Sequence, residues 1–210
     1  EVIRALVRKH GVDVECRDDK GATALHSAAT SGNAESVSEL VGIHSADIEA
    51  FDNDGFTAIH HASNQGKDSC LERLIRLRGD VNAGLCPQDA TVATPGATPL
   101  HLAAMNGKTS TVLLLIRHGA QVEKRDSSGW TALLYADYCK QRDCVVAMLQ
   151  PDDPDVCAEQ LRLLAELLQS PVRTTRERAT QVLEYVATVP EFFGAINSYV
   201  AANPLMLDTT

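Results

Sequence analysis

The sequence is poor in aromatic residues: Phe, Trp and Tyr make up 4% of its 210 residues, although 44% are hydrophobic. Such a composition, rich in Leu and Ala, favours helices that stack on helices. No apolar run approaches the roughly 20 residues that a membrane-spanning helix needs. No signal peptide is visible either, so we expect a cytoplasmic protein.

The patterns of common catalytic and metal sites are missing as well. The six cysteines lack the close C-x-x-C pairs of a zinc site and are expected to be reduced thiols. No His-Glu-x-x-His motif, Ser/His/Asp order or carboxylate pair stands out. Gly107-Lys108-Thr109-Ser110 resembles the end of a phosphate-binding loop, but Leu102 occupies the position of its first glycine. The sequence therefore predicts no enzyme, no metal and no cofactor.

Basic residues are outnumbered, since 19 Lys and Arg face 28 Asp and Glu, which gives a formal net charge of −9. A surface this acidic argues against nucleic acid or an anionic membrane as the main partner. It favours a protein partner with a basic face.

What the chain does contain is an internal repeat. Four short stretches begin at Thr23, Thr57, Thr98 and Thr131, at offsets of 34, 41 and 33 residues, and three of them read Thr-x-x-His. Asp-x-x-Gly precedes three of the copies, and this is turn chemistry, because Asp accepts backbone hydrogen bonds and Gly adopts positive φ. A period near 33 residues with a Thr-Pro-Leu-His core resembles the ankyrin repeat.

The resemblance implies an all-α ankyrin-repeat solenoid of helix-turn-helix repeats with hairpin loops over residues 1–150. Its parts are a partial repeat at 1–17, full repeats at about 18–51, 52–84 and 93–125, a final repeat at 126–150, and an insertion at 84–95. The first helix of a repeat is expected to follow the Thr, for example at 99–105. The resemblance also implies that His26, His60 and His101 tie neighbouring turns together by hydrogen bonds.

Both ends of the array depart from this pattern. Residues 1–15 resemble the second helix and exit turn of a repeat whose first half is absent, so we expect a fragment of a longer chain. Residues 151–210 are expected to be helical, at 156–169, at 174–189 and from Pro190 onward. This segment resembles an armadillo-type helical repeat. We expect it to stack on the array, because about 60 residues bury little on their own.

In ankyrin proteins the concave face is built from hairpin tips and the exposed side of the first helices. That pattern predicts a partner-binding strip, here called the predicted strip, made of Asp19, Lys20, Asn53, Asp54, Phe56, Asn64, Gln65, Met105, Asn106, Trp130 and Tyr138. The three aromatic residues are its expected anchors, because aromatic side chains dominate interface hot spots. An aromatic residue before the Thr can instead pack on the adjacent hairpin. Asp19, Asp54 and Asp137 are expected at the rim.

The predicted function is that of a non-catalytic scaffold for protein–protein interaction, within a larger chain or complex. One alternative is the substrate-recruiting arm of a larger enzyme such as a ubiquitin ligase. Another is a structural subunit of a large assembly.

Overall fold

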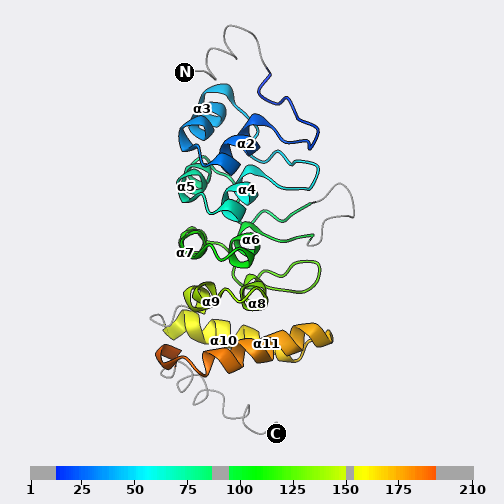
Figure 1. Cartoon of the computed structure of the whole chain (residues 1–210), viewed down its shortest axis with the longest axis vertical. Helices are drawn as coiled ribbons and strands as arrows, with labels where there is room; N and C mark the ends of the chain where they lie inside the picture. Colours follow the sequence, from blue (N-terminus) through cyan, green and yellow to red (C-terminus); the bar gives the residue numbers. More distant parts are fainter. Residues whose placement is uncertain (1–12, 87–94, 150–153, 193–210) are drawn as a thin grey trace.

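The computed structural model describes residues 13–86, 95–149 and 154–192, which form an elongated stack of helices without a strand (Figure 1). The first eight helices of the described residues are four antiparallel pairs: α2 (Ala24–Ser31) with α3 (Ala34–His44), α4 (Ala58–Gln65) with α5 (Asp68–Arg76), α6 (Pro99–Met105) with α7 (Thr109–Arg117), and α8 (Ala132–Tyr138) with α9 (Arg142–Leu149). The predicted all-α repeat solenoid is confirmed.

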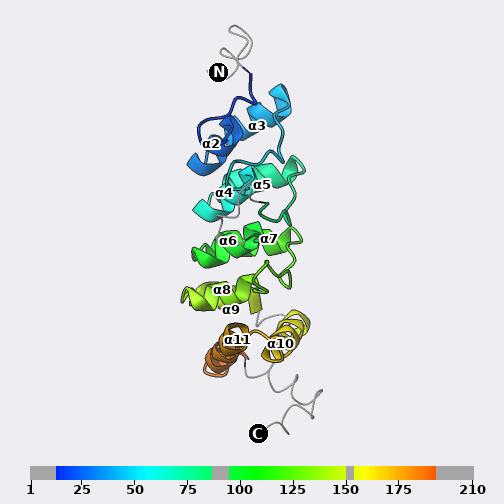
Figure 2. The same ribbon diagram turned by 90° about the vertical axis from the view of Figure 1, so that its right-hand side faces the viewer.

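The pairs are arranged in two layers. The first helices α2, α4, α6 and α8 pack on one another, and the second helices α3, α5, α7 and α9 form the other layer (Figures 1 and 2). Neighbouring first helices come close to one another because small residues lie between them. Ala62, Ala103 and Ala136 have no exposed surface. The hairpins project from the side of the first helices.

Glycines end the first helices of the first two pairs. Gly32 and Gly66 have φ of +85° and +70°, a left-handed conformation that suits glycine. The side-chain stem of Lys67 lies over Gly32, and that of Lys108 lies over Gly66. Lys108 of the sequence that resembles a phosphate-binding loop therefore packs on the preceding repeat.

The insertion begins and ends in a paired stem. The amide of Leu85 donates to the carbonyl of Ala97, and the amide of Gly96 donates to the carbonyl of Leu85, both at 2.8 Å. Leu85, Ala97 and Leu102 form a small apolar cluster of their own, against which Phe56 packs. The predicted enlargement of this hairpin thus has a stem, whereas residues 87–94 lie outside the described part.

The C-terminal helices extend both layers. α10 (Pro154–Leu168) packs on α9, and α11 (Arg173–Val186) packs on α8 (Figure 2). The main core runs without interruption from Leu25 to Phe192, which confirms that this segment stacks on the array. The order of the two layers is reversed here, since the helix of the second layer comes first. The likeness to an armadillo repeat stays a prediction, and the predicted helix beyond the 3-10 turn Pro190–Phe192 lies outside the described residues.

Candidate partner-binding surface

The hairpin tips of the first two repeats are joined through Asn53. Its backbone amide donates to the carbonyl of Lys20 at 2.9 Å, and its side-chain amide donates to the carbonyl of Asp19 at 3.3 Å. Asp19, Lys20, Asn53 and Asp54 are all exposed. The structure therefore brings these four residues of the predicted strip together, and Asn53 also holds the tips in register.

A buried aspartate organises the second hairpin. One carboxylate oxygen of Asp52 accepts the amides of Asp54 and Phe56, at 3.1 and 2.8 Å. The other accepts a hydrogen bond from Nε2 of His61 at 2.8 Å. The backbone of the tip is thereby fixed before any partner arrives.

The fourth hairpin repeats this arrangement with a different donor. One oxygen of Asp126 accepts the amides of Ser128 and Trp130, both at 2.9 Å, and the other accepts the hydroxyl of Tyr135. Burial raises the pKa of Tyr135, and the hydrogen bond to Asp126 raises it further. The phenol therefore stays protonated and donates.

The three motif histidines link each repeat to the next hairpin. In each case the amide of the motif Thr donates to Nδ1, at 3.0 to 3.2 Å, so the proton lies on Nε2. That Nε2 donates to a carbonyl of the following hairpin, at 3.0 or 3.1 Å, namely Ala50 for His26, Ala83 for His60 and Trp130 for His101. Burial lowers the pKa of all three imidazoles, to about 4 for His60. The predicted structural role of these histidines is confirmed.

The ends of the first helices meet across neighbouring repeats. The side-chain amide of Asn106 donates to the side-chain oxygen of Asn64 at 2.8 Å, and also to the carbonyl of Leu102 at 2.9 Å. Gln65 and Asn106 are exposed, whereas Asn64 and Met105 are half-buried. In the second and third repeats the predicted strip is thus continuous from α4 to α6.

Two of the three aromatic residues expected as anchors, Phe56 and Trp130, are partly covered by their neighbours. Phe56 is half-buried, its ring 5.3 Å from that of His61. Trp130 is half-buried as well, with its ring 5.0 Å from that of Tyr135. Asp52 and Asp126 hold His61 and Tyr135 beside these rings, and Phe56 also packs against the apolar cluster of Leu85, Ala97 and Leu102.

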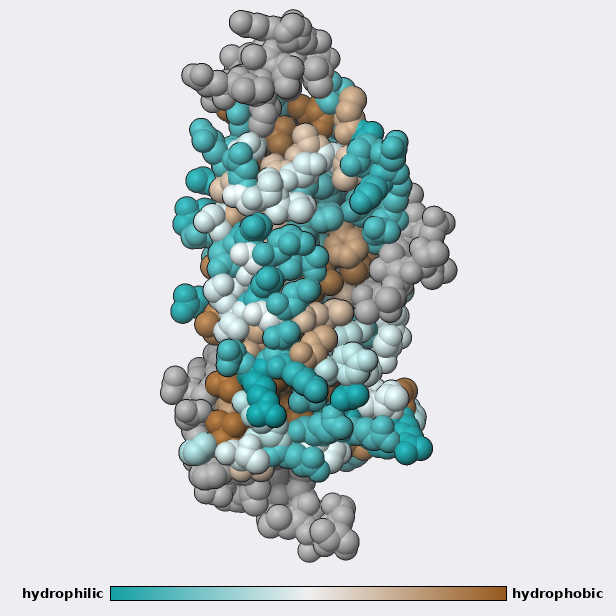
Figure 3. Space-filling model, in the orientation of Figure 1, coloured by the Kyte–Doolittle hydropathy of each residue, from teal (hydrophilic) through white to brown (hydrophobic). Residues whose placement is uncertain are grey.

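Tyr138 is 53% exposed, and its ring also contacts the C-terminal helices. The guanidinium of Arg178, on α11, lies 4.6 Å from the centre of its ring. Because α11 continues the layer of the first helices, it closes this end of the predicted strip. Hydrophilic side chains cover much of the face seen in Figure 3, with small apolar patches between them.

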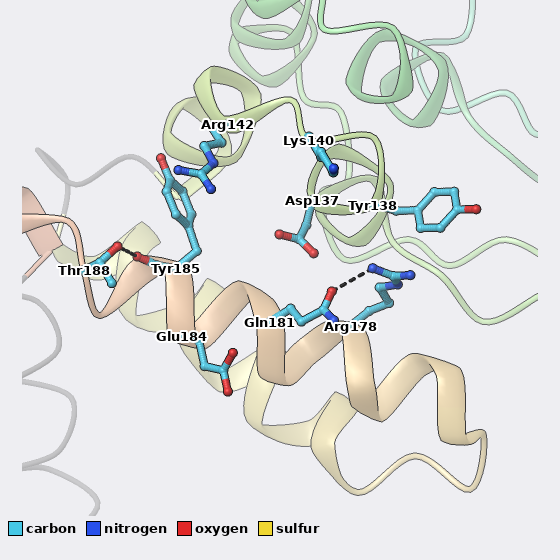
Figure 4. A pocket seen from close by; sticks show the side chains of 9 residues that line it. All are labelled: Asp137, Tyr138, Lys140, Arg142, Arg178, Gln181, Glu184, Tyr185 and Thr188. Carbon is cyan, nitrogen blue, oxygen red and sulfur yellow. Dashed lines mark hydrogen bonds between the residues drawn. The ribbon is translucent and has the colours of Figure 1, made fainter.

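A cavity of about 620 Å³ lies where the last repeat meets α11, and we call it the junction cavity (Figure 4). It is lined by Asp137, Tyr138, Lys140, Arg142, Arg178, Gln181, Glu184, Tyr185 and Thr188. Asp137, expected at the rim of the strip, lines this cavity. Burial raises the pKa of Asp137, and the nearby charges of Arg178 and Arg142 act in the opposite direction. The repeat pattern gave no signal for this cavity, since α11 lies outside it.

Comparison with known families decides the identity of the array. A family model described as ankyrin repeats, in three copies, matches residues 1–84 and 79–160. The chain belongs to the ankyrin repeat family. Ankyrin repeats are generally protein–protein interaction modules, and the match ends inside α10.

Individual relatives are similar over short stretches. Ankyrin repeat and SAM domain-containing protein 6 of Mus musculus is 46% identical over 55 residues, which are 26% of this chain and 6% of the relative. Protein phosphatase 1 regulatory subunit 27 of Homo sapiens is 41% identical over 44 residues, which are 21% of this chain and 29% of the relative. The ankyrin chain thus aligns with less than a third of either relative.

Residues 13–86, 95–149 and 154–192 hold no group of three or more His, Cys, Asp or Glu side chains that could bind a metal ion. In the same ranges, no helix has the length and apolar character to span a membrane.

Proposed function

We propose that this ankyrin array is a non-catalytic scaffold that binds a protein partner along the predicted strip. The observation that supports this most directly is the alignment of polar side chains across repeats. The hydrogen bond between Asn106 and Asn64 holds two consecutive first helices in register, and exposed Gln65 lies beside it. A partner segment that follows α4 also meets α6.

Charge at the hairpin end supports a partner with Lys or Arg side chains. Asp19 and Asp54 are exposed on neighbouring tips, in a chain of net charge −9. Exposed charge of this kind raises the rate of association more than it deepens the affinity.

An enzyme-linked role is the second candidate. The human relative is named as a regulatory subunit of protein phosphatase 1, so at least one similar repeat protein bears the name of an enzyme subunit. Under this alternative the same strip recruits a substrate or an enzyme, and a catalytic chain is expected among the captured partners. A cytoplasmic location remains part of the proposal.

A pair of matched double variants tests the binding surface. Gln65→Lys with Ser128→Lys adds charge to the strip, at Gln65 itself and at the exposed hairpin residue two positions before Trp130. Ser69→Lys with Ser110→Lys adds the same charge to the exposed second-helix side. Proteins captured by the unmodified chain should be lost with the first variant and kept with the second, as counted by quantitative mass spectrometry. Equal retention by both variants would exclude the strip.

A further inference from the structure

The junction cavity collects positive charge in an otherwise acidic chain. Lys140 comes from the turn after α8, Arg142 from the start of α9, and Arg178 from α11. Figure 4 shows these three cationic side chains around one opening. Three separate elements therefore supply donors to the same space.

Two of these cations are held in place by aromatic rings. The guanidinium of Arg142 lies 4.8 Å from the ring centre of Tyr185, and that of Arg178 lies 4.6 Å from the ring centre of Tyr138. Arg178 also donates one hydrogen bond, of 2.7 Å, to Gln181. A guanidinium has five N–H groups, so stacking fixes the position of these side chains and leaves most donors available.

The carboxylates of the cavity do not satisfy those donors. Within the described part of the chain, Asp137 forms no ion pair within 4.0 Å of either arginine, and Lys140 has no side-chain acceptor. Three cations against Asp137 and Glu184 leave one net positive charge. That balance fits a single added carboxylate better than a doubly charged phosphate.

We propose that the junction cavity binds the carboxylate of an acidic side chain from a protein partner. Arginine suits this ligand, because its planar donors match the two oxygens of a carboxylate. The inference deepens the proposed function and rests on it for the source of the ligand. A partner on the strip would place basic residues at Asp19 and Asp54 and an acidic residue between α8 and α11. These two ends fix the direction in which the partner runs along the strip.

A blocked peptide, acetyl-Gly-Ser-Glu-Glu-Ser-Gly-amide, is the probe, titrated into the isotope-labelled whole chain. We expect a Kd of about 1 mM, the range of a weak single site. Amide signals should shift between Tyr138 and Arg142 and along α11. The peptide with Gln in place of Glu should cause no saturable shift.

Three single variants test whether peptide binding follows the charge of the cavity. Arg178→Gln should weaken binding about tenfold, and Lys140→Gln about threefold, as expected for charge-assisted hydrogen bonds. Asp137→Asn should tighten it about threefold, because it removes a competing carboxylate. Arg73→Gln, an exposed arginine of α5, is the matched control and should change nothing.

Several results would overturn the inference: no saturation, equal weakening by Arg178→Gln and Arg73→Gln, or weaker binding to Asp137→Asn. If a peptide with phosphoserine in place of Glu bound more than about tenfold more tightly, the ligand group would be a phosphate and not a carboxylate. The strip variants of the capture experiment leave the junction cavity intact. Failure of the acidic peptide would therefore not count against the strip, and loss of the strip function would not abolish peptide binding.

Discussion

The junctions between ankyrin repeats and the junction between the last repeat and α11 are held by different chemistry. Between repeats, a neutral buried histidine reaches from one helix to a carbonyl of the next hairpin. At the last junction this position is Leu134, which is fully buried and has no side-chain group that could hydrogen-bond to the next element. At that junction, arginines stacked on tyrosines form the contacts instead. The junctions between repeats, here called closed, therefore stabilise the array. The junction with α11, here called open, keeps charged groups available for a ligand.

The largest expected effect comes from placing a charge inside a closed junction. Ala103 has no exposed surface between α6 and its neighbours, so Ala103→Asp buries an unpaired carboxylate. We expect a loss of about 3–5 kcal/mol in the free energy of unfolding. Because neighbouring repeats stabilise one another, the urea transition should also broaden. Ala24→Asp, at an exposed site of α2, is the control and should stay within about 0.5 kcal/mol.

Acid should weaken the closed junctions through their histidines. Burial holds the pKa of His60 at about 4 in the folded chain, below its value of about 6.5 when unfolded. The unfolded state thus binds more protons, and stability present above pH 6.5 should fall as the pH drops toward 4. The shift at this one site corresponds to a loss of roughly 3 kcal/mol in the free energy of unfolding. Denaturation curves at several pH values would measure the slope.

His60→Leu copies the residue found in the fourth repeat and should flatten that slope while lowering stability at pH 7. An unchanged pH dependence in this variant would assign the effect to other groups.

Two glycine variants separate the effect of the contact between hairpin tips from that of backbone strain. Gly21 and Gly129 occupy the same repeat position, with φ of +73° and +78°. A Cβ at Gly21 would lie 2.9 Å from the backbone nitrogen of Asn53, whereas a Cβ at Gly129 meets nothing within 4 Å. Gly129→Ala should cost about 1 kcal/mol, and Gly21→Ala about 1–3 kcal/mol more. Equal losses in thermal unfolding would show that the tips do not press on each other.

The smallest effect is expected at the open junction. Arg142 is exposed and rests on Tyr185, and a cation–π contact at such a site contributes about 0.5–1 kcal/mol. Arg142→Gln should therefore change the free energy of unfolding by less than about 1 kcal/mol. A loss comparable to that of Ala103→Asp would mean that this junction is closed as well.

The repeat array could be predicted because its signals are local. The expected helix at 99–105 is α6 itself, since Thr98, Pro99 and His101 set its start within one turn. Likewise, the helices expected at 156–169 and 174–189 correspond to α10 and α11.

The candidate site was harder to predict because it depends on which elements become neighbours. Nothing in the repeat pattern says that α11, rather than α10, lies on α8 and brings Arg178 to Tyr138. Partial burial of Phe56 also depends on Leu85 and Leu102, far apart in the sequence.

The paired stem at Leu85 and Ala97 has a practical consequence. Because hydrogen bonds of Leu85 with Gly96 and Ala97 join the two sides of the insertion, the number of residues between them is decoupled from the spacing of the repeats. Doubling the length of such a closed loop costs only about 0.6 kcal/mol. The stem is therefore an attachment point at which a fluorescent or affinity label can be spliced into the middle of the chain, within reach of the predicted strip.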